Sequence, residues 1–66
     1  MTDKFIVFGK LGQYVVTAES FIRAIQAVIA QTNTVALDWN CHALNGYPQK
    51  YQAKILGDFR TIILCY

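Results

Sequence analysis

One adjacent pair in the sequence, Cys41 and His42, combines a nucleophile with a base. Catalysis by such a pair requires that the thiol and the imidazole meet in space and that a third group orients the imidazole. Adjacent residues of a strand point to opposite faces, so an extended segment would separate the two side chains. Asp38 or Asn40 could orient His42, but their spacing is not distinctive. We therefore expect no catalytic residues and a non-enzymatic protein.

Metal and cofactor sites are not expected either. Two cysteines and one histidine without a Cys-x-x-Cys pair fall short of a closed zinc site. The four acidic residues do not form a carboxylate pair for general acid–base chemistry. The stretch Gly9 to Gly12 contains Lys10 but lacks the glycine spacing and the closing Lys-Ser/Thr of a phosphate loop. It predicts a hairpin turn instead.

Cations beside aromatic side chains suggest a second kind of chemistry, the binding of nucleic acid. Lys50 and Lys54 flank Tyr51, which could stack on a base while the lysines contact phosphates. Against this, a net charge of +2 is too sparse for strong non-specific affinity. Nucleic-acid binding is therefore the alternative function, and its predicted residues are Lys50, Tyr51, Lys54 and Arg60.

The segment 40–48 follows Trp39 and contains Tyr47 near its end, and Trp and Tyr are enriched at binding hot spots. A long loop in so small a domain is often functional. The alternative is that Trp39 covers the hydrophobic core under a helix. The same segment is either a loop or one helical turn followed by a loop.

The chain is short and apolar for its length. Its 66 residues make a single small domain, residues 1–66, in which little interior is available. Ala, Val, Ile, Leu, Met, Phe, Trp, Cys and Gly make up 36 of the 66 residues, above the usual share of about 45–50%. We expect the surplus to remain on the surface, which favours a homo-oligomer or another protein partner.

The sequence predicts a cytoplasmic protein. The N-terminal apolar stretch is too short for a secretory signal, and no run approaches the ~18 apolar residues of a membrane span, so we expect no membrane association. Cys41 and Cys65 could form a disulfide after export. Because nothing signals export, reduced cysteines are the favoured alternative.

Hydrophobic periodicity predicts one helix, over 20–31. The residues Phe21, Ala24, Ile25, Val28 and Ile29 recur at helical spacing. Ser20 precedes them and can cap the first turn. Thr32 and Asn33 then form a turn.

Alternating patterns predict five strands. The first two, over 4–8 and 13–17, form a hairpin across the turn 9–12. A third covers 34–39, although Leu37, Cys41 and Leu44 also have helical spacing. The last two cover 50–56 and 59–66 and are joined by a tight turn at Gly57 and Asp58. Because the last strand is apolar on both faces, we expect it to be central in the sheet or covered on both sides.

These elements predict an α+β fold of order ββαβββ, an antiparallel sheet of four to five strands with one helix on one face. The other face would stay partly open and carry Ile62, Leu64 and Tyr66, with Phe8 and Tyr14 or Val15. We predict that a protein partner binds this face and the segment from Trp39 to Tyr47. The predicted partner-binding residues are Trp39, His42, Tyr47, Tyr51, Ile62, Leu64 and Tyr66.

The segment from Tyr14 to Ser20, which runs from a strand into a helix with Ala24 four residues later, resembles a design found in small phage-encoded proteins. Podophage inhibitors of bacterial RNA polymerase and several anti-CRISPR proteins are of this size. The resemblance covers roughly Phe5 to Trp39. It implies a viral inhibitor that binds and blocks a host enzyme in the host cytoplasm. The weakly basic charge departs from the acidic pattern common among such inhibitors and argues against DNA mimicry.

Overall fold

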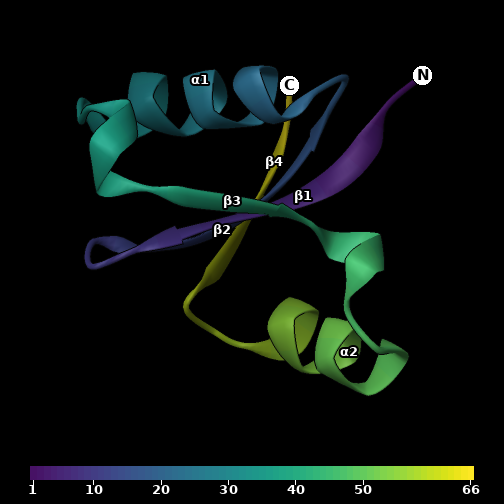
Figure 1. Ribbon diagram of the computed structural model, residues 1–66. Coiled ribbons are helices and arrows are strands. Elements are labelled where there is room, and N and C mark those ends of the chain that lie inside the picture. The colour runs from purple at the N-terminus through teal and green to yellow at the C-terminus, as the bar shows by residue number, and fades with distance from the viewer.

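The chain forms an α+β fold around a four-stranded mixed sheet (Figure 1), and the computed structural model describes residues 1–66. In chain order the elements are β1 (Asp3–Gly9), β2 (Gly12–Ala18), α1 (Phe21–Thr32), the 3₁₀ turn η1 (Ala36–Asp38), β3 (Asn40–Ala43), the 3₁₀ turn η2 (Leu44–Gly46), α2 (Gln49–Gly57) and β4 (Thr61–Cys65). The strands lie in the order β3-β1-β2-β4. β1 is antiparallel to β2 and β3, whereas β4 runs parallel to β2.

The predicted N-terminal hairpin is confirmed. β1 and β2 pair from Asp3 opposite Ala18 to Gly9 opposite Gly12. Gly12 has a φ of 144°, which residues with a Cβ rarely adopt, so glycine suits this end of the turn. The register places Phe5 and Val7 on one face of β1 and Ile6 and Phe8 on the other.

The predicted helix is also confirmed, as α1. The Ser20 hydroxyl accepts a hydrogen bond from the Arg23 backbone N–H at 3.2 Å and caps the first turn. Asn33 ends the helix in the left-handed conformation. The residues that face the sheet most closely, Ala24, Ala27 and Val28, are small, so the helix lies close to the β1–β2 hairpin.

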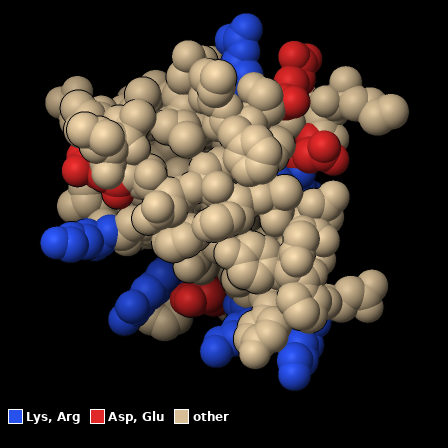
Figure 2. Space-filling model, in the orientation of Figure 1, with Lys and Arg blue, Asp and Glu red and all other residues tan.

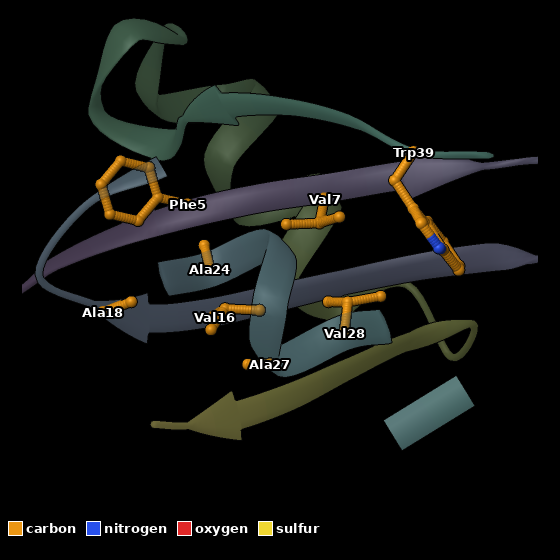
Figure 3. Close-up of a cluster of buried hydrophobic side chains, with 8 residues drawn as sticks. All are labelled: Phe5, Val7, Val16, Ala18, Ala24, Ala27, Val28 and Trp39. Carbon is orange, nitrogen blue, oxygen red and sulfur yellow. The ribbon is translucent and has the colours of Figure 1, made fainter. Parts of the chain in front are cut away.

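The main core lies between α1 and the sheet (Figure 3). Trp39 is only 6% exposed and closes one end of this core. Its indole N–H donates to the Thr34 hydroxyl at 2.7 Å, and its ring meets the Tyr14 ring edge-on at 5.6 Å. The core therefore satisfies the one polar atom that Trp39 brings into it. Its members are Phe5, Val7, Val16, Ala18, Ala24, Ala27, Val28 and Trp39.

The opposite face of the sheet has a smaller cover, formed by η2 and α2 (Figure 1). Ile6 and Val15 point away from α1 and yet are 3% and 0% exposed. Leu44 of η2, at 2%, is buried as well. This second face is therefore not open at its centre, contrary to the sequence-based expectation.

The prediction of a strand over 50–56 is wrong, because these residues form the helix α2. The Pro48 carbonyl accepts hydrogen bonds from the N–H groups of Tyr51 and Gln52 at 2.9 and 3.0 Å, which starts the helix. Gln, Lys, Ala and Leu have high helix propensity, and Lys54 lies near the negative end of the helix dipole. The alternation of polar and apolar residues over 50–56 is therefore a weaker indication of a strand than the composition is of a helix.

The strand predicted over 34–39 is also wrong. The Asp38 carboxylate folds back to accept a hydrogen bond from the Val35 N–H at 3.4 Å, and the backbone turns through η1. The third strand begins only at Asn40 and pairs with β1. The segment 40–48 is therefore neither a loop nor one helical turn followed by a loop. It contains the strand β3 followed by the turn η2.

The last strand exists as β4, but it is neither central nor joined by a hairpin. It follows α2 and lies at the edge of the sheet beside β2, with which it is parallel. Asp58 forms the bend before it, accepting from the Thr61 N–H through its carbonyl and from the Arg60 N–H through its carboxylate. The element order is therefore ββαβαβ, with η1 and η2 as turns, and the sheet is not purely antiparallel.

Gly9 offers a test of how η1 is held against the hairpin. A Cβ added at this position would meet the backbone carbonyl of Asp38 and, at 3.3 Å, the Trp39 ring. We expect Gly9→Ala to displace this segment and to lower the free energy of unfolding by ~1–3 kcal/mol, as overpacking does. Urea unfolding would measure the change. Gly46→Ala, where nothing lies within 4 Å, is the matched control. Equal stability of the two variants would contradict this packing.

Candidate interaction surface

Cys41 and His42 lie on β3, where their side chains point to opposite faces of the sheet. The register places Cys41 opposite Val7 on the α1 face and His42 opposite Ile6 on the other. Burial without a compensating partner raises the pKa of the Cys41 thiol to about 11, so little thiolate forms near neutrality. The geometry therefore gives Cys41 no base and no activation. Nor do three or more His, Cys, Asp or Glu side chains gather in a group that could hold a metal ion.

The predicted partner-binding residues fall into separate groups. Trp39 belongs to the core, as the alternative interpretation had it, and offers no surface. His42 stacks on Phe8 at 5.6 Å and meets the Tyr47 ring edge-on at 6.4 Å. Tyr51 lies on α2 and is 49% exposed.

The remaining three, Ile62, Leu64 and Tyr66, belong to β4 and the residue after it. Ile62 and Leu64 are register partners of Tyr14 and Val16, so they lie on the α1 face. The prediction that they lie on the face away from the helix is wrong, because β4 pairs in parallel with β2 in a register that aligns them with residues of the α1 face. Ile62 and Tyr66 are nonetheless 51% and 61% exposed.

Sequence reasoning missed one residue of this region, Ile63. It lies on the α2 side of β4 and is 59% exposed. The signal was present in the sequence as a strand with apolar residues on both faces. This pattern predicts a strand that is central in the sheet or covered on both sides, whereas β4 is an edge strand with both faces partly exposed. We call Thr61–Cys65 together with Tyr66 the β4 surface.

The outer side of β4 also presents unpaired backbone groups. The Tyr66 N–H donates to the Thr17 carbonyl at 3.1 Å, and Thr17 is the register partner of Cys65. In a parallel ladder alternate residues bond to the same neighbour. Ile62 and Leu64 therefore direct their N–H and C=O groups toward β2, and those of Ile63 and Cys65 point outward.

β4 has none of the features that usually prevent an edge strand from pairing with another chain. The strand contains no charged residue, no proline and no bulge, which are the usual protections of an exposed edge. The other edge strand, β3, is shorter at four residues and carries the polar Asn40 and His42. The β4 surface is therefore the exposed edge best suited to bind another chain.

The cationic residues lie elsewhere. Lys50 and Lys54 are one helical turn apart on α2, and the Lys50 ammonium lies 5.4 Å from the centre of the Tyr51 ring. Arg60 lies in the bend before β4, with its guanidinium 5.8 Å from the centre of the exposed Phe59 ring. Figure 2 shows Lys and Arg side chains along the lower side of the molecule, where α2 lies in Figure 1.

No protein-family model matches the chain, and no curated protein or solved structure shows significant similarity to it. Neither helix has the length and apolar character of a membrane span.

The environment of Cys41 predicts low reactivity. In a Cys65→Ser background, we expect iodoacetamide at pH 8 to modify Cys41 about 100-fold more slowly in the folded protein than in urea. The reason is that a rise in pKa from 9.0 to about 11 lowers the thiolate fraction by that factor. Mass spectrometry of timed samples measures both rates. A folded-state rate above the urea rate would show an activated thiol and revive a catalytic role.

Proposed function

We propose that this protein is a non-enzymatic protein–protein interaction module and that the β4 surface is its binding site. The observation that carries the proposal is an uncharged edge strand with Ile62 and Ile63 on it and Tyr66 directly after it, each more than half exposed. Exposed apolar groups that adjoin one another mark interaction sites, whereas singly scattered ones are normal. Open backbone groups beside them allow a partner to add a strand to the sheet.

The resemblance to small phage-encoded inhibitors implies that the partner is a host enzyme and that binding blocks it. We include this as the specific form of the proposal, with the cytoplasm as its location. Cys41 and Cys65 lie on the two opposite edge strands of the sheet and are free thiols, so they do not form a disulfide with each other. On this proposal the aromatic and aliphatic groups of β4 supply affinity, while the cations play little part.

A second candidate function, nucleic-acid binding, rests on the cations beside exposed rings. Lys50 and Lys54 accompany Tyr51 on α2, and Arg60 accompanies Phe59, which is 92% exposed. Exposed rings can stack on bases while the cations contact phosphates. The four residues predicted from the sequence belong to a helix and a bend instead of two strands, but they remain on the surface.

The protein-binding proposal predicts that Ile62→Asp removes partner capture. A charge at this position would lie within the apolar contact, and we expect at least a ~10-fold loss of bound partner, as for a binding hot spot. Leu37→Asp is the matched control, because Leu37 is 97% exposed and lies outside the β4 surface. Immobilised wild-type and variant proteins would be compared for the lysate proteins that they retain, with quantification by mass spectrometry.

A protein retained by the wild type and the Leu37 variant but lost with the Ile62 variant supports the proposal. If that protein is an enzyme, its activity should fall on addition of the wild type and not on addition of Ile62→Asp. The absence of any Ile62-dependent partner, including a second copy of the chain, would overturn the protein-binding proposal.

The nucleic-acid alternative makes a different prediction, which concerns salt. Three phosphate contacts would give single-stranded binding a slope of about −2 in log K against log salt concentration. Lys54→Glu should then weaken binding and reduce the slope, whereas partner capture through β4 should not change. Fluorescence anisotropy with a labelled oligonucleotide measures both. No binding at low salt would exclude this function.

A further inference from the structure

The central residue of β4, Ile63, has an aliphatic neighbour on each side, Ile62 and Leu64. The strand reads Thr-Ile-Ile-Leu-Cys from Thr61 to Cys65. Reversed, it places an aliphatic residue opposite each of its three central positions. The outward N–H and C=O of Ile63 lie at the centre of this symmetry.

We propose that β4 pairs with β4 of a second copy of this chain, antiparallel and about a two-fold axis at Ile63. The inference rests on the proposed function, since it names the partner of the same surface. That partner is a second copy, which takes the place of a host enzyme at β4. Two copies would share one continuous sheet, with β4 and its counterpart as the central strands. An isologous contact of this kind closes after two copies and leaves no further β4 edge exposed.

The proposed register satisfies the backbone groups that face outward. The N–H of Ile63 donates to the C=O of the partner's Ile63, and the reciprocal bond forms by symmetry. The N–H of Cys65 then donates to the C=O of the partner's Thr61. In an antiparallel ladder these are hydrogen-bonded pairs, which alternate with pairs whose side chains lie closer together.

The closer pairs are apolar. Ile62 lies opposite the partner's Leu64 on the α1 face, and Leu64 lies opposite the partner's Ile62. On the other face Ile63 lies against the partner's Ile63. Beyond the strand, Arg60 comes opposite the partner's Tyr66, whose aromatic ring suits a guanidinium. No like charges oppose one another anywhere in this register.

Pairing through β3 is less suitable. That edge has only four residues, and it would bring Asn40 and His42 together in place of aliphatic side chains. A single residue, Ile63, therefore lies on the proposed axis and faces itself. This allows a test that depends on symmetry and not merely on the loss of an apolar group.

The test is the solution mass of charge variants at position 63, measured by light scattering over a dilution series. The wild type and the control Leu37→Lys should show twice the 7.5 kDa of one chain, at low and high salt. Ile63→Lys and Ile63→Asp should each be monomeric, since like charges would oppose one another on the axis. An equimolar mixture of the two variants should return to the dimer mass at low salt, because the pair then carries opposite charges.

A wild type that is monomeric throughout the series would overturn the inference. So would variants that stay dimeric, or folded variants whose mixture stays monomeric. Circular dichroism establishes that the variants are folded. If they are not, amide hydrogen exchange of the wild type decides the question. Exchange at Ile63 and Cys65 should be slow in concentrated samples and fast after dilution, and fast exchange at every concentration would contradict the pairing.

Failure of this inference is distinguishable from failure of the proposed function. A monomeric wild type that still captures a different protein in an Ile62-dependent manner leaves the protein-binding module in place and removes only the second copy as its partner. A monomer without any such capture removes both.

Discussion

The structure is governed by how little chain is available to cover its sheet. Four strands create two faces and two edges, and 66 residues supply only a twelve-residue helix and a nine-residue helix to cover them. α1 protects the β1–β2 hairpin closely because Ala24 and Ala27 let it approach. η2 and α2 protect Ile6 and Val15 on the other face. The edge strand β4 is left with Ile62 and Ile63 exposed. They are one part of the apolar surplus, which also includes exposed side chains elsewhere, among them Leu11, Ile22, Val35, Leu37 and Phe59.

The residue types that could take part in catalysis, the cations and the exposed apolar strand lie in different parts of the fold. Cys41 and His42 point to opposite faces of the sheet, and burial raises the pKa of the Cys41 thiol to about 11, so the one pair with catalytic residue types lacks the geometry of catalysis. The cations are spread over α2 and the bend before β4, whereas β4 itself has no charge. Largely different surfaces thus support the two proposed functions, and Arg60 is the one residue assigned to both.

The sequence predicted the first half of the fold well. The hairpin depends on local alternation and on Gly12, and α1 depends on a helical stripe with Ser20 as its cap, so both signals lie within the segments themselves. α2 was missed because the seven alternating residues are also compatible with a helix, which begins directly after Pro48. Their high helix propensity favours the helix over the strand. β3 was displaced because the Asp38 carboxylate stabilises η1, a local bond that the apolar pattern does not reveal.

The position of β4 could not be read from its own residues, because an apolar strand in the centre of a sheet and an apolar strand at an exposed edge have the same pattern. What distinguishes them is the arrangement of the other strands. For the same reason the sequence located Ile62, Leu64 and Tyr66 as binding residues but placed them on the wrong face, and it missed Ile63. The edge is unprotected because the strand order leaves β4 outside β2 with no further strand beside it.

The pairing of β4 with its own counterpart, in register about Ile63, can be observed in solution. An isotope-filtered NOE experiment on a mixture of labelled and unlabelled wild-type chains tests it most directly, since it detects only contacts between copies. We expect intermolecular contacts between Ile62 and the partner's Leu64, because the two form a closely spaced pair of the antiparallel ladder. Intermolecular contacts that involve α1 or β3 and exclude β4, or none at all, would contradict it.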